Sequence, residues 1–291
     1  MSDLPHRLGD AAPGIAVACA LFLALALYIR AWRAGALTPR DAVGPWRITA
    51  LLRPVLFLGG ILAIAVVAEP PVSILGNRTV TFHILQDMVL LMVAPPLLVL
   101  GVCRVTGAEQ GSRSTVGRLW GTVTQPWIAV LLFNAGLVLW FVMEPRGHAP
   151  AGPLLPVEQA TLALVGAAYW WAAIDPRRST AVSGRTAWLR VTMLVPGIML
   201  TLMIGYVLIG APTTSADPGV TGVVGLTQRA DSQIAGLIML ALGNFVTLGA
   251  VLALLGGLMS AEEDDEEDEE QDGRPATPAA NRAPVAPSRA A

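Results

Sequence analysis

The chain has 291 residues, of which 54% are hydrophobic and 14% charged, whereas soluble domains carry about 25% charged residues. This composition argues against a soluble enzyme. All 19 basic residues are arginine, and 21 acidic residues bring the formal net charge to -2. That near-neutral total combines a basic body, up to Ser260, with a tail in which ten acids lie between Glu262 and Asp272.

Apolar residues occur in seven stretches of membrane-crossing length, since about 20 residues span a hydrocarbon layer of about 30 Å. We predict spans at residues 11–29, 48–68, 81–103, 126–143, 155–174, 191–210 and 232–259. Strand-like alternation is absent, and a membrane admits only helices or closed barrels. The sequence therefore predicts an all-α, polytopic membrane protein whose residues 1–260 form a seven-helix transmembrane bundle in the lipid bilayer.

The arginines indicate how this bundle is oriented. Of the 16 arginines in the body, twelve fall in one alternating set of loops and helix ends and four in the other. Because basic loops stay cytoplasmic, we expect the N-terminus outside and the C-terminus in the cytoplasm. Residues 261–291 are acidic and then rich in Pro and Ala. They contain too little apolar surface to offset chain entropy, so we predict a disordered cytoplasmic tail.

Polar side chains enter the spans near their predicted outer ends. His83 and Asp87 lie one helical turn apart in the third span and share a face, with Asp87 about 10 Å below the outer boundary. Glu158 and Asp231 begin the fifth and seventh spans, and Met143 ends the fourth. Intramembrane ionisable groups are functional candidates. Imidazole, carboxylate and thioether together suit copper or zinc, so we predict an outer-leaflet metal site.

The four ionisable residues also have a plainer interpretation. His83 and Asp87 could belong to a satisfied hydrogen-bond network between helices. Glu158 and Asp231 could be solvated acids favoured by the dipole at a helix start.

Methionines recur at helical spacing, as Met88 and Met92 and as Met199 and Met203. Core packing explains them more simply than a ladder of soft-metal ligands. Prolines are predicted to kink two spans, and small residues should let the last span approach its neighbours closely. These prolines and glycines are Pro95, Pro96, Pro196, Gly236, Gly243, Gly249 and Gly256.

Motifs of hydrolytic enzymes are absent from the chain. There is no Gly-rich phosphate loop, no G-x-S-x-G and no His pair at metalloprotease spacing. No long basic stripe with interleaved aromatics is present either. We therefore expect neither a classical enzyme nor a nucleic-acid partner.

The third span also carries a family resemblance. The run FHILQDMVLLMVAPPLLVLG, residues 82–101, resembles the signature of the CtaG-type family of bacterial cytochrome c oxidase assembly factors. His83, Gln86 and the A-P-P-L-L run from Ala94 match that signature. The run DSQIAGLIM, residues 231–239, is similar to the family's D-Q-x-x-G-L-I-M, with Ser232 in place of Gln.

The resemblance covers the seven-span body and implies a protein of the bacterial plasma membrane. Its implied role is to help assemble a haem-copper cytochrome c oxidase by handling or delivering copper, with an oxidase subunit or a copper chaperone as partner. His83 carries over as a copper ligand. Asp87, however, stands where the family has a second His, and Phe141 and Gln159 stand where it often has two more.

The leading hypothesis is therefore a copper-linked assembly factor. Its candidate metal residues are His83, Asp87, Asp231, Glu158 and Met143. Carboxylates bind Cu(I) poorly but are acceptable ligands for Cu(II) or zinc. Two alternatives stay open: a metal-free scaffold of the same fold that docks an oxidase subunit, and a proton-coupled small-solute transporter that uses Asp87.

Overall fold

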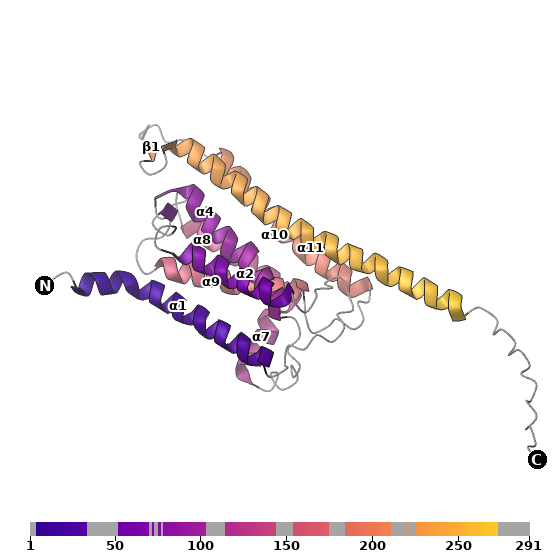
Figure 1. Ribbon diagram of the computed structural model, residues 1–291. Helices are drawn as coiled ribbons and strands as arrows, with labels where there is room; N and C mark the ends of the chain where they lie inside the picture. Colours follow the sequence, from indigo (N-terminus) through magenta and orange to yellow (C-terminus); the bar gives the residue numbers. More distant parts are fainter. Residues whose placement is uncertain are drawn as a thin grey trace, which may run out of the picture.

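A computed structural model describes residues 4–33, 52–69, 72, 75–76, 78–102, 114–143, 154–174, 184–210, 220–221 and 225–272. This part of the chain is helical almost throughout, which confirms the all-α class (Figure 1). Its strands are β1 (Val220–Thr221) and β2 (Leu226–Thr227), which pair antiparallel. Gly225, directly before β2, has a φ of +70° that favours glycine.

The helices agree with the predicted spans to within several residues at most ends. They are α1 (Leu4–Arg33), α2 (Leu52–Ala68), α4 (Val80–Met88), the π-helix η1 (Val89–Val93), α5 (Ala94–Val102), α8 (Pro126–Met143), α9 (Leu154–Ile174), α10 (Gly184–Gly210) and α11 (Gln228–Asp272). A short helix that was not predicted, α7 (Thr115–Val123), precedes α8. The Ser114 hydroxyl accepts a hydrogen bond from Gly117 N at 2.9 Å and caps its first turn.

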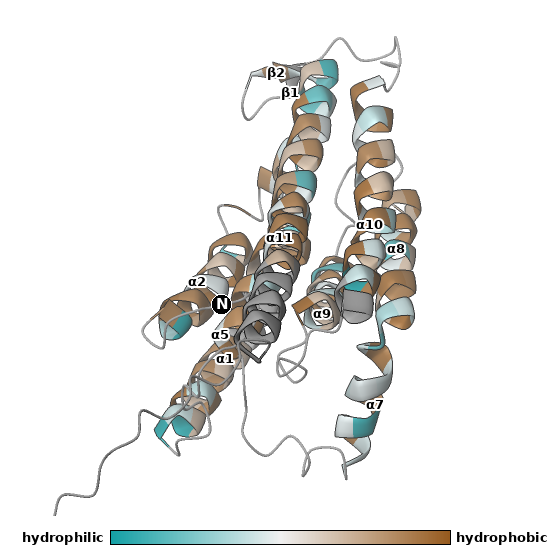
Figure 2. Ribbon diagram, turned by 90° about the vertical axis from the view of Figure 1, so that its right-hand side faces the viewer, coloured by the Kyte–Doolittle hydropathy of each residue, from teal (hydrophilic) through white to brown (hydrophobic). Residues whose placement is uncertain are grey.

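Four helical stretches within the described residues are long and apolar enough to cross a membrane. They are Val80–Val102, Pro126–Met143, Trp188–Gly210 and Gln228–Gly256. Helix α2 is apolar but has only 17 residues. Apolar residues run along most of these helices in Figure 2. Length and composition of the described helices thus support a membrane protein with four candidate spans, and the count of seven stays a prediction.

The sequence predicts disorder from Ala261 onward, but α11 continues as a helix to Asp272. Glu is a good helix former. Adding residues to an existing helix also avoids the cost of nucleating a new one. The prediction is therefore wrong for residues 261–272. Residues 273–291 lie outside the described part of the chain.

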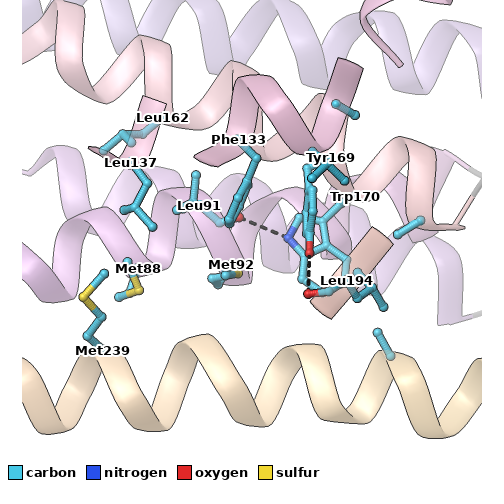
Figure 3. Close-up of a cluster of buried hydrophobic side chains, with 14 of the residues drawn as sticks. Met88, Leu91, Met92, Phe133, Leu137, Leu162, Tyr169, Trp170, Leu194 and Met239 are labelled. Atoms are coloured by element: carbon cyan, nitrogen blue, oxygen red, sulfur yellow. Dashed lines mark hydrogen bonds between the residues drawn. The ribbon is translucent and has the colours of Figure 1, made fainter. Parts of the chain in front are cut away.

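The segment α4–η1–α5 lies in the middle of the bundle and packs against α2, α9 and α11. Its two prolines, Pro95 and Pro96, have no N–H to donate back along the helix, so the carbonyl of Leu91 loses its ordinary partner. The indole Nε1 of Trp170 donates to this carbonyl at 3.1 Å (Figure 3). The predicted kink is thus a π-helical turn, and α9 supplies the missing donor.

Helices α10 and α11 lie side by side along much of their length (Figure 1). A Cβ on Gly236 of α11 would lie 2.6 Å from the Gly205 carbonyl oxygen of α10, so only glycine fits. A Cβ on Gly243 would lie 3.3 Å from the Cβ of Thr201, which is a tight contact but a less severe one. A Cβ on Gly249 or Gly256 would meet no described atom within 4 Å. The predicted close approach is therefore confirmed for the first two of the four glycines.

The two methionine pairs lie in different surroundings. Met88 and Met92 are completely buried, as packing predicts, but Met199 and Met203 are 55% and 56% exposed on α10. The core-packing prediction is thus wrong for the second pair. Helical spacing indicates a shared face of one helix, but it does not indicate whether that face meets another helix.

Candidate metal centre

The site is built at the first turn of α4. Thr79 caps this helix, since its Oγ1 accepts a hydrogen bond from Phe82 N at 3.4 Å. The backbone N–H of His83 donates to Thr79 O at 3.2 Å, which places the imidazole one turn into the helix. Asp87 follows four residues later, so both side chains lie on the same face of α4.

A second helix brings a carboxylate to this face. His83 Nε2 lies 3.5 Å from Asp87 Oδ2 and 3.5 Å from Glu158 Oε1, which belongs to α9. One ligand atom from each of the three side chains lies within 4.8 Å of the others. His83, Asp87 and Glu158 are 1%, 6% and 0% exposed. The structure therefore brings together three of the five predicted metal residues.

The carboxylate of Glu158 indicates that this cluster suits a cation. Neither of its oxygens accepts a hydrogen bond from the described residues, although the side chain is fully buried. A buried, ionised carboxylate is strongly disfavoured unless a proton or a positive charge compensates it, and a bound cation among these three side chains would supply that charge. One imidazole nitrogen and two carboxylates are a donor set that zinc or Cu(II) accepts and Cu(I) disfavours.

Asp231 lies in the first turn of α11 and binds backbone instead. Its Oδ2 accepts the N–H of Val80 and its Oδ1 accepts the N–H of Thr81, each at 2.9 Å. The Thr81 hydroxyl donates in return to the main-chain oxygen of Asp231 at 2.9 Å. These contacts saturate the helix start where α4 would otherwise have unpaired donors. Asp231 thus clamps α11 to α4, two residues before His83.

Met143, the fifth predicted metal residue, and Gln86, a residue of the family-like pattern, are not part of the group of three. Met143 ends α8 with 54% of its surface exposed, and it is not buried with the cluster. Gln86 is buried, and its Nε2 donates to the Val67 carbonyl of α2 at 2.8 Å. A Cβ on Gly76 would overlap the Gln86 side-chain oxygen, so glycine leaves room for this amide.

Sequence reasoning did not find the hydrogen bonds of Asp231 and Trp170. The sequence predicts Asp231 as a metal residue or, alternatively, as a solvated acid favoured by the dipole of its own helix. Its actual partner is the start of another helix, about 150 residues earlier. The sequence does indicate that a carbonyl near Leu91 needs another donor, because the two successive prolines Pro95 and Pro96 have no backbone N–H. Which residue would supply it depends on packing.

A comparison with known protein families finds a match over most of this chain. The cytochrome c oxidase caa3 assembly factor family (Caa3_CtaG) matches residues 26–261. No curated protein and no solved structure matches the chain. The matched range includes every helix from α2 to the start of the acidic part of α11, and with it the buried cluster. Since the match covers well over half of its residues, this chain belongs to the cytochrome c oxidase caa3 assembly factor family.

Proposed function

We propose that this assembly factor handles copper for a haem-copper oxidase and binds it through His83, Asp87 and Glu158. The carrying observation is the buried cluster itself, in which an imidazole and two carboxylates come within 4.8 Å of one another. An assembly role needs no bond-breaking chemistry on the protein, so the proposed role is not enzymatic. Copper is then cargo passed to an oxidase subunit or received from a chaperone.

The charges of the cluster favour a divalent ion. A neutral imidazole and two carboxylates sum to a charge of about -2, which a divalent cation neutralises and a monovalent one does not. In a low-dielectric interior, uncompensated charge is costly. We therefore infer that copper is held here as Cu(II), and that zinc would compete for the same ligands.

The proposed topology places this cluster toward the outer face. Seven spans would comprise the four long apolar stretches together with α1, α2 and α9. Glu158 and Gln159 place two polar residues in the first turns of α9. The excess of arginine in alternate loops supports a cytoplasmic location for the opposite end of the bundle. His83, Asp87 and Glu158 would then face the compartment in which the oxidase receives its copper.

Metal binding by the purified protein tests this proposal. We expect the wild type to bind about one Cu(II) per chain, and His83→Ala to weaken binding by more than about 100-fold, because removing even an outer-sphere partner of a metal ligand costs 10–100-fold. Glu158→Gln should weaken binding strongly as well. Glu69→Gln is the matched control, since Glu69 is an exposed carboxylate at the end of α2. Equal Cu(II) affinity in the wild type and His83→Ala would refute the proposed site.

A cellular assay separates copper handling from docking. In cells lacking this protein, the optical spectrum and copper content of the oxidase would be compared after complementation with each variant. We expect His83→Ala/Asp87→Ala to leave the oxidase copper-deficient. Full oxidase assembly with this double variant would instead favour the metal-free scaffold.

A further inference from the structure

The short helix α7 is amphipathic, yet none of its residues is buried. Its large apolar side chains recur every three or four residues and form one stripe along the helix. They are Val116, Leu119, Trp120 and Val123. At about 100° per residue, these four positions fall within an arc of about 100°. Arg118 and Thr122 lie outside that arc, so α7 has one apolar side and one polar side.

The two ends of this apolar stripe have different surroundings. Near the end of α7, the ring of Trp120 meets the edge of Trp171 on α9, with their centroids 5.8 Å apart. Val116 and Leu119, about one turn earlier, are 78% and 64% exposed. Exposing adjacent Val and Leu side chains to water forfeits the free energy that burial would give. An apolar environment outside the described bundle is therefore the favourable surrounding for this half of the stripe.

The position of α7 in the fold indicates that this environment is the membrane. The candidate span α8 begins at Pro126, directly after the short turn that follows α7. Trp127, in the first turn of α8, is exposed, and tryptophan favours the membrane–water interface. In Figure 1, α7 runs across the direction of α1 and α11 instead of extending it. A helix placed in this way can hold its apolar side against lipid and its polar side in water.

We propose that α7 is an interfacial helix that binds the surface of the bilayer crossed by α8. Val116 and Leu119 enter the lipid, while Arg118 faces water. The contact between Trp120 and Trp171 then ties the membrane surface to the end of α9 that lies opposite Glu158. This inference goes beyond the proposed function and does not depend on it, because α7 contributes no residue to the buried cluster.

Spin labels on the full chain in nanodiscs of phosphatidylcholine and phosphatidylglycerol test this placement. Each label is attached to one cysteine, Leu119→Cys or Gly121→Cys, in a Cys19→Ser/Cys103→Ser background. The two sites lie about 200° apart around the helix, and a Cβ on Gly121 would meet no described atom within 4 Å. We expect the label at 119 to collide with oxygen but not with a water-soluble nickel chelate, and the label at 121 to do the reverse. Their depths should differ by about 10 Å, the width of a helix.

A label at Val116→Cys then reports on two aspartate variants. Leu119→Asp should bring this label into water and raise its nickel collisions, because a carboxylate is costly to place in lipid. Thr122→Asp adds the same charge on the polar side and should change nothing. Three results would overturn the proposal: equal nickel collisions at 119 and 121, a label at 119 shielded from both oxygen and nickel, or the same response to both aspartates. The second result would mean that protein, and not lipid, covers the stripe.

Discussion

Replacing Asp231 by Asn tests how the start of α4 is held in place. The carboxylate accepts the N–H groups of Val80 and Thr81 at 2.9 Å each, and the side chain is 1% exposed. An amide offers one acceptor oxygen, so Asp231→Asn leaves one buried N–H without a partner. Hydrogen bonds to charged groups contribute about 1.5–3 kcal/mol. We therefore expect a loss of about 2 kcal/mol, or about 30-fold in the local opening equilibrium.

Hydrogen exchange measured on the protein in lipid nanodiscs reports this change directly. Amides of residues 79–83 should exchange about 30-fold faster in Asp231→Asn, while amides in the middle of α8 keep their wild-type rates. Because His83 lies in the affected turn, Cu(II) affinity should fall as well. Glu69→Gln makes the same chemical change at an exposed site and should alter neither measurement. Wild-type exchange rates at residues 79–83 in Asp231→Asn would refute the clamp.

Two further predictions concern the π-helical turn, each measured as unfolding stability in detergent. Gly166→Ala should destabilise by about 1–3 kcal/mol, since its Cβ would lie 2.9 Å from the Leu91 carbonyl oxygen. Gly249→Ala, where a Cβ meets open space, should be neutral or stabilising by up to about 1 kcal/mol; equal effects at the two glycines would contradict this account. Trp170→Phe should cost about 1–3 kcal/mol, because Pro95 leaves the Leu91 carbonyl no other helical donor; unchanged stability would show that the bond contributes nothing.

Much of the architecture could be predicted from the sequence because hydropathy and local chemistry act over one helix at a time. The bounds of α8 match the predicted span, and the two prolines after Ala94 do interrupt an α-helix. His83 and Asp87 share a face because residues four apart always do in an α-helix. Local patterning was less reliable at the tail, where the absence of apolar residues suggested disorder but an existing helix continued.

Which residues of different helices lie next to one another was decided only by the tertiary structure. Periodicity fixes which residues share one face of a helix, but the neighbour on that face depends on how helices pack. Close packing of α9 against η1 at Gly166 accompanies the approach of Glu158 to His83. The Asp231 carboxylate accepts a hydrogen bond from the start of α4 and is not part of the cluster. The sequence by itself therefore determined the helices and the pairing of His83 with Asp87, and helix packing decided that Glu158 joins them in the buried cluster.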